Sequence, residues 1–269
     1  TTLWFTLCLD LTQMLSVTAI SRNHYVSPGI VDSVLNTILY ERPETLPETL
    51  GIDEFKGSSG DWDPERSRWN VNKYHCNISD GDAGIVKDVL PQINSEYLIQ
   101  YFKQYSAEQR SKVKYYCCDM HNGFISVAKV LFPQAHICID LFHVVKLIND
   151  TIDTIRRRLQ RDMEEQQEKE KYSLLRRAAR SLLSSELKQK RLGNPNNAKR
   201  LEKLKAVFNM FPELEEAYHA SQEFHSINAE NQLILQKAGL TDWIDRYQAS
   251  NVPELEKLAR SIQHWRSYL

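Results

Sequence analysis

Five apolar segments between residues 50 and 140 are short enough to be strands, and three of them carry an aspartate at or near their C-terminal end. The strands are expected at 50–55, 69–78, 85–90, 113–119 and 135–140. Turn-forming residues separate the first three segments. Helices are expected over 95–111 and 123–132, one before each of the last two strands. The region therefore predicts a sheet in which turns connect the first three strands and helices precede the last two.

This element order discriminates between two fold classes. In a doubly wound fold every strand is followed by a helix. Here three strands form a meander, and only the later two are joined through helices. That order is typical of a ribonuclease-H-like mixed sheet. We therefore predict an α/β (α+β) fold with a core at 47–147, preceded by a helical region at 1–46 and followed by an all-helical insertion at 148–269.

The N-terminal region is expected to form two helices. Its apolar residues recur at helical spacing, with a break near His24, and Ser27-Pro28 is a good start for the second helix. Helix, turn, helix is an arrangement that many DNA-binding domains use, and a plain helical hairpin is the alternative. In the DNA-binding interpretation Ser33 and Asn36 face the groove and Arg22 lies near the backbone. Packing is then expected through Ile30, Val34 and Ile38.

The C-terminal region carries many basic residues interleaved with acidic ones. Arg156, Arg157 and Arg158 begin this stretch. They are either part of a solvated helix face with ion pairs four residues apart or a surface for DNA phosphates. Trp243 and Trp265 fall at helical spacing with Leu and Ile, which predicts that both are core residues.

Composition excludes a membrane span but does not single out a partner. The formal net charge is −1, so nothing in the overall charge favours nucleic acid. No run of eighteen apolar residues exists. The five cysteines form no C-x-x-C pair and lie mostly in apolar segments, which favours reduced thiols in a cytoplasmic protein.

The strand-terminal acids are the candidate catalytic residues. In a ribonuclease-H-like sheet the first and fourth strands are adjacent, so Asp53 and Asp119 should come together. Two facing carboxylates repel each other unless a cation lies between them. Hard oxygen ligands favour Mg²⁺ or Mn²⁺, and two such ions can hold the attacking and leaving oxygens of a phosphodiester in line.

Three further residues are assigned supporting roles. Glu54 follows Asp53 and should point to the opposite face of the strand, as a structural or second-layer partner. Asp140 and His143 are expected at the edge of the site. For these two, capping the helix that begins near Val144 is an equally good interpretation.

Three motifs together resemble the insertion-sequence transposases of the ISL3 type. They are Leu-Pro-Glu-Thr-Leu-Gly-Ile-Asp-Glu-Phe-Lys-Gly at 46–57, Cys-Asp-Met-His-Asn-Gly-Phe at 118–124, and the segment at 132–146 that contains Asp-Leu-Phe-His-Val-Val-Lys. The resemblance implies a bacterial DNA transposase that cuts and joins transposon ends with two Asp, one Glu and divalent metal. Asp53 and Asp119 match the two Asp. Double-stranded transposon-end DNA is the implied partner, with a homodimer assembled on it.

Two elements of that family are not found in the sequence. The third acid is expected after the helical insertion, beyond Leu269, and a cysteine-rich, zinc-binding module is expected before the helix-turn-helix. We therefore expect this chain to bind DNA weakly without cutting it. The alternative is a non-catalytic DNA-binding remnant or regulatory piece of a transposase.

Overall fold

The computed structural model describes residues 3, 6–7, 16–35, 42–58, 62–63, 68–69, 73–193 and 195–269. The chain divides into two compact units, Thr1–Thr45 and Leu46–Leu269.

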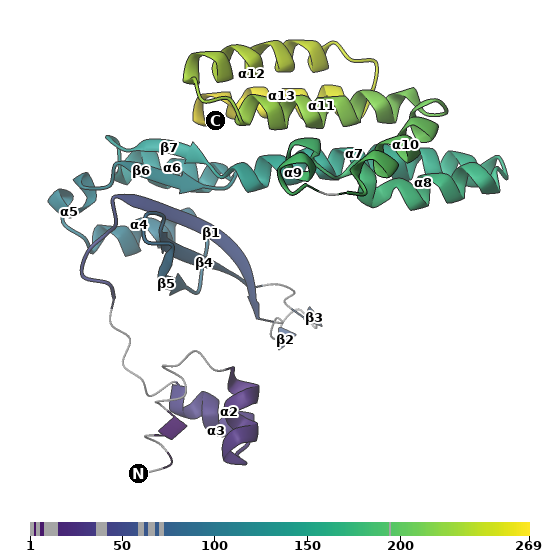
Figure 1. Ribbon diagram of the computed structural model, residues 1–269. Coiled ribbons are helices and arrows are strands. Elements are labelled where there is room, and N and C mark those ends of the chain that lie inside the picture. Colours follow the sequence, from purple (N-terminus) through teal and green to yellow (C-terminus); the bar gives the residue numbers. More distant parts are fainter. Residues whose placement is uncertain are drawn as a thin grey trace. The chain divides into compact units, whose positions relative to one another are not determined.

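The first unit contains the two expected helices, α2 (Val17–His24) and α3 (Pro28–Leu35) (Figure 1). Ser16 caps α2 by accepting a hydrogen bond from the Ala19 backbone N–H at 3.2 Å, and Tyr25 ends it in the left-handed conformation. The small core consists of Leu7, Ile20, Val31 and Val34.

One packing prediction for this unit was wrong. Ile30 is 46% exposed, and its neighbour Val31 is buried instead. The turn of the helix thus presents position 31, and not position 30, to α2. Val34 is buried as predicted, while Asn36 and Ile38 lie outside the described residues.

The second unit is built on a mixed five-stranded sheet in the order β5-β4-β1-β6-β7. Strand β1 pairs antiparallel with β4 and parallel with β6. Strands β4 and β5 are antiparallel, and β6 and β7 are parallel. This mixed sheet is consistent with the predicted ribonuclease-H-like fold. The strands are β1 (Thr49–Ser58), β4 (Lys73–Asp80), β5 (Ile85–Leu90), β6 (Tyr115–Cys118) and β7 (His136–Ile139), with a separate short pair β2 (Trp62–Asp63) and β3 (Arg68–Trp69).

Helices α4 (Ser95–Lys103) and α6 (Asn122–Leu131) pack on each other and share one core with the sheet. The single helix expected over 95–111 is in fact two, because the chain turns after Lys103 and α5 (Ala107–Ser111) starts anew. Ser106 and Gln109 form a capping box at that start, which stabilises the beginning of a second helix. The sequence Ser-x-x-Gln was the signal for this break.

The remaining chain is helical, as expected. Helix α7 crosses the predicted domain boundary at 147/148 without a break (Figure 1). The hydrophobic core continues from the sheet into the helices. Trp243 and Trp265 are buried, which confirms that they are core residues. The helices are α7 (Leu141–Glu165), α8 (Lys169–Leu182), α9 (Glu186–Arg191), α10 (Asn197–Phe208), α11 (Pro212–Asn228), α12 (Leu233–Gln248) and α13 (Pro253–Trp265), followed by the 3₁₀ turn η1 (Arg266–Tyr268).

Two smaller predictions concern the cysteines and membrane spans. Cys76, Cys117, Cys118 and Cys138 are free thiols, as predicted, and Cys8 lies outside the described residues. Within the part of the chain that the structure describes, none of the helices has both the length and the apolar character needed to cross a bilayer.

Candidate metal centre

The register of the sheet brings Asp53 and Asp119 together. Strands β1 and β6 run parallel, and Ile52 of β1 lies opposite Cys118 of β6. The residue that follows each of these two is therefore at the same level of the sheet, at the carboxyl end of β6. The predicted adjacency of Asp53 and Asp119 is confirmed.

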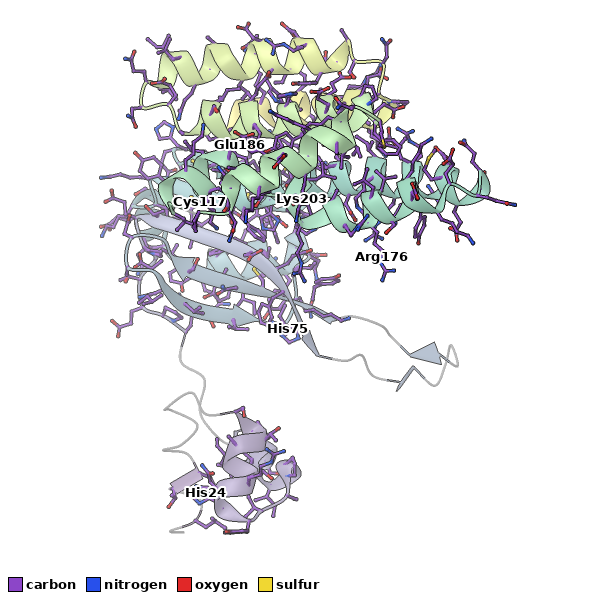
Figure 2. All side chains as sticks on the ribbon, turned by 45° about the vertical axis from the view of Figure 1, so that its right-hand side comes forward. His24, His75, Cys117, Arg176, Glu186 and Lys203 are labelled. Atoms are coloured by element: carbon purple, nitrogen blue, oxygen red, sulfur yellow. The ribbon has the colours of Figure 1, made fainter. Side chains whose placement is uncertain are left out.

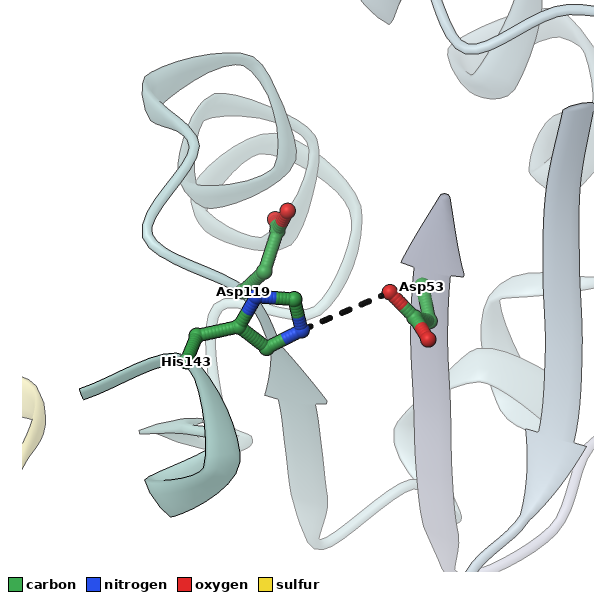
Figure 3. Close-up of side chains that lie close together, drawn as sticks. All are labelled: Asp53, Asp119 and His143. Atoms are coloured by element: carbon green, nitrogen blue, oxygen red, sulfur yellow. Dashed lines mark ion pairs between the residues drawn. The ribbon is translucent and has the colours of Figure 1, made fainter. Parts of the chain in front are cut away.

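His143 joins the two aspartates from the first turn of α7. Its Nε2 atom lies 3.5 Å from Oδ1 of Asp53 (Figure 3). One ligand atom from each of Asp53, Asp119 and His143 lies within 4.8 Å of the others. Sequence reasoning had placed His143 only at the edge of the site, because the direction of α7 relative to the sheet is set by tertiary packing.

The surroundings of Asp119 are unfavourable for a charged carboxylate. The residue is 9% exposed, and among the described residues no group donates a hydrogen bond to its Oδ1 atom. Burial raises the pKa of Asp119 above its usual range; the charge of His143 opposes the shift, and those of Glu54 and Asp53 add to it. A buried carboxylate without a donor is unfavourable unless a cation compensates it.

Asn77 is a residue that sequence reasoning missed. It lies opposite Asp53 in the antiparallel pairing of β1 with β4, so the two side chains share one face of the sheet. Its Oδ1 atom is buried, and no described residue donates a hydrogen bond to it. The long connection between β1 and β4 leaves their register open, so no sequence signal placed Asn77 beside Asp53.

The negative charges of Asp53 and Asp119 also affect the buried thiol of Cys76 on β4. The pKa of buried Cys76 is raised to about 12, first by burial and then by the charges of Asp53 and Asp119. The two carboxylates and the imidazole of His143 form a donor set, and Asn77 lies on the same face of the sheet, opposite Asp53. Oxygen-rich sets of this kind suit Mn²⁺ or Mg²⁺, so the residues present fit a divalent cation.

Two of the predicted neighbours do not join the cluster of Asp53, Asp119 and His143. Asp140 caps α7 by accepting a hydrogen bond from the Phe142 backbone N–H at 2.8 Å. Of the two interpretations that the sequence left open for Asp140, the structure therefore shows the helix cap. That helix begins at Leu141, three residues earlier than expected. Glu54 lies on the face of β1 that carries buried Leu50 and Ile52, and it affects Asp119 through charge alone.

The residues predicted to bind DNA are placed as follows. Arg22 and Ser33 are exposed in the first unit. On α7, Arg156 and Arg157 pair with Asp153, and Arg158 pairs with Glu213 and Glu254. The ion pairs of Arg158 join α7 to α11 and α13. DNA contact by any of these five residues stays a prediction.

Comparison with known proteins gives one family. No curated protein matches the chain. The family model for the DDE transposases of the ISL3 family, described as a transposase, matches residues 50–269. The match begins in β1, just before Asp53, and covers the sheet, the metal-ligand cluster and the helices that follow. The chain therefore belongs to the ISL3 family of DDE transposases.

Proposed function

We propose that the protein is a DNA transposase that cuts and joins transposon-end DNA by metal-dependent phosphodiester chemistry. The observation that carries the proposal is the cluster of Asp53 within β1, Asp119 just after β6 and His143 in the first turn of α7. Membership of the transposase family supports it independently.

Asp53 and Asp119 are assigned as the metal ligands. Asp53 is half exposed and can meet a substrate phosphate, whereas Asp119 is almost buried and fixed by the end of β6. His143 is assigned as a positioning residue or third ligand, because its Nε2 atom faces Asp53. A bound divalent cation would polarise the phosphodiester and stabilise the charge that develops on its oxygens.

The partner proposed is the double-stranded DNA of transposon ends. In this proposal the helix pair α2–α3 contacts DNA through Arg22 and Ser33, and two copies of the chain assemble on paired ends in the bacterial cytoplasm. Both helices carry few charges of their own, so this contact would rely on hydrogen bonds as much as on phosphate attraction.

The cluster contains only two carboxylates. Two-metal chemistry requires further oxygen ligands for the second ion. We therefore propose that the described cluster binds one ion firmly and that a further carboxylate completes the site in the cutting reaction. The second candidate function, DNA binding without cutting, is favoured by the same observation.

A nicking assay separates the two. The chain is incubated with a labelled duplex carrying the element's end and with Mn²⁺, beside Asp53→Asn and the matched control Asp140→Asn. Binding without nicking supports the second function for this chain. Robust nicking that Asp53→Asn abolishes and Asp140→Asn retains supports the transposase chemistry, and shows that the carboxylate set is complete within these residues. Equal nicking by all three chains would overturn the assignment of Asp53.

A further inference from the structure

Basic residues are concentrated in one part of a chain that is nearly neutral overall. Residues 169–205 contain twelve Lys and Arg but only three Glu and no Asp, whereas the whole chain has 34 basic and 35 acidic residues. This segment forms α8, α9 and α10. The rest of the chain is therefore net acidic, and the excess of basic residues is concentrated on these three helices.

The charges in this layer differ from those on α7 in how they are paired. On α7, the guanidinium groups at 156–158 are all matched by carboxylates of Asp153, Glu213 and Glu254. On α8 and α10, by contrast, the basic side chains at 176, 177, 180, 199 and 203 form no ion pair with any described residue. Arg200 is a separate case, because it donates hydrogen bonds to the Ser181 carbonyl and to Tyr218 and so anchors α10.

The unpaired residues lie on common helix faces. On α8, Arg180 lies four residues after Arg176 and three after Arg177, and on α10 Lys199 and Lys203 are four residues apart. All five are exposed. Figure 2 shows Arg176 extending from α8 away from the helical layers. We call these five residues the α8–α10 basic surface.

The two helices meet in a shallow groove with a basic side chain on each side. Arg177 of α8 and Lys203 of α10 line this groove of about 330 Å³, together with Ser181. Its floor is apolar and consists of Leu174, Ala178, Leu204 and Val207. Because these apolar side chains pack between α8 and α10, they fix the distance between the two helices. The basic side chains of α8 and those of α10 are therefore held at a fixed separation.

A cluster of like charges without counter-charges repels itself. An external polyanion removes that repulsion, and a polymer with regularly spaced phosphates also releases its own counterions on binding. We propose that the α8–α10 basic surface binds the phosphate backbone of double-stranded DNA without reading its sequence. This inference rests on the proposed function, and it names a DNA-holding surface apart from the metal centre.

Two features favour duplex DNA over other polyanions. The residues that line the groove between α8 and α10 include no aromatic ring, and single-stranded nucleic acid is typically held by bases stacking on such rings. Helix α7 also connects the two sites: His143 lies in its first turn, and α8 packs along it. At 1.5 Å per residue α7 is about 37 Å long, which is roughly one turn of duplex. A duplex whose end reaches the metal centre could thus follow α7 to this surface.

The test measures DNA affinity against salt concentration with the full chain. A fluorescent 30-base-pair duplex of arbitrary sequence is titrated in EDTA, so that no divalent metal contributes. The variant carries Arg177→Gln, Arg180→Gln and Lys203→Gln. The matched control carries Lys237→Gln, Lys257→Gln and Arg260→Gln, three exposed basic residues on α12 and α13. Circular dichroism confirms that both chains are folded.

The slope of log affinity against log salt should become shallower by about 0.9 for each phosphate that is no longer neutralised by a basic side chain. The slope of the variant is expected to change by about three such increments, and that of the control by none. An unchanged slope in the variant, or an equal change in the control, would overturn the proposal. Preference for single-stranded RNA over the duplex would overturn it as well.

The result is independent of the metal centre. If the surface variant binds duplex normally while Asp53→Asn still abolishes metal binding, the surface proposal fails and the proposed function stands. If the surface variant no longer binds duplex but metal binding is insensitive to Asp53, the proposed function fails instead.

Discussion

The Nε2 atom of His143 lies 3.5 Å from Oδ1 of Asp53, although one residue belongs to α7 and the other to β1. The contact depends on where α7 begins. Asp140 caps the helix at Leu141, which places His143 in the first turn, beside the carboxyl ends of the strands. The start of α7 at Leu141 therefore places the His143 side chain beside Asp53.

Replacement of His143 by Ala should weaken Mn²⁺ binding about tenfold or more, because losing a ligand or an orienting partner typically has an effect of this size. Isothermal titration of Mn²⁺ measures it. His136→Ala is the matched control, since His136 is exposed at the far end of β7. An unchanged affinity in His143→Ala would remove His143 from the centre.

Replacement of Asp140 by Ala should lower the free energy of unfolding by about 1 kcal/mol, the usual effect of losing an N-cap. Mn²⁺ affinity should stay within about threefold of the unmodified chain. Urea unfolding and metal titration check the two halves of this prediction. A large loss of metal affinity with unchanged stability would show that Asp140 is a ligand and not a cap.

Replacement of Asn77 by Ala separates metal binding from stability. The Oδ1 atom of Asn77 is buried and accepts no hydrogen bond from a described residue. Removing an unsatisfied polar atom should leave stability unchanged or raise it by up to about 1 kcal/mol. Mn²⁺ affinity should fall several-fold. Thermal unfolding with and without Mn²⁺ measures both, and a loss of stability without metal would contradict this role.

The ion pair between Arg158 and Glu254 should make stability depend on pH. Its Nε and Oε1 atoms are 2.7 Å apart, and Arg158 lowers the pKa of Glu254 below its ordinary 4.5. A lowered carboxyl pKa stabilises the fold above the ordinary pKa, and this contribution is lost as the pH falls through the lowered value.

Glu254→Gln should therefore lower the free energy of unfolding by about 1.5 kcal/mol near neutral pH. The difference from the unmodified chain should shrink steadily below pH 4.5. Glu256→Gln is the control, because its pairing with Arg260 lies on the exposed surface of one helix, where such pairs contribute little. A difference that persists unchanged into acid would contradict the ion-pair account.

The sequence was sufficient for the strand order and the two aspartates, because both depend on local signals. Alternating apolar residues and turn residues mark the strands. Asp119 directly follows β6 as predicted, whereas Asp53 lies within β1, which extends to Ser58 and is longer than the sequence indicated. The positions of Asn77 and His143 depend instead on the register between β1 and β4 and on the direction of α7. Packing sets both, so a single sequence does not reveal them.

Charge pairing was only partly visible in the sequence, which predicted ion pairs four residues apart such as that of Arg157 with Asp153. Arg156 and Arg158 looked equivalent to the arginines of α8, but the α7 residues meet carboxylates. Glu213 and Glu254 are distant along the chain, so only the folded structure shows that they neutralise Arg158. Basic residues that can bind a ligand are therefore recognised only once the folded structure shows which of them already form ion pairs within the chain.

The central claim is that Asp53 and Asp119 together hold a divalent cation, and calorimetric titration with Mn²⁺ tests it most directly. The unmodified chain should bind one Mn²⁺ per chain, and Asp53→Asn and Asp119→Asn should each abolish that binding while the fold is retained. Asp88→Asn is unsuitable as a control because Asp88 is buried against Tyr101, so exposed Asp150→Asn is used instead. Saturable binding of one Mn²⁺ that is lost only in the two Asp variants is the predicted result. Mn²⁺ binding that is equally strong in Asp53→Asn, Asp119→Asn and Asp150→Asn would contradict the account.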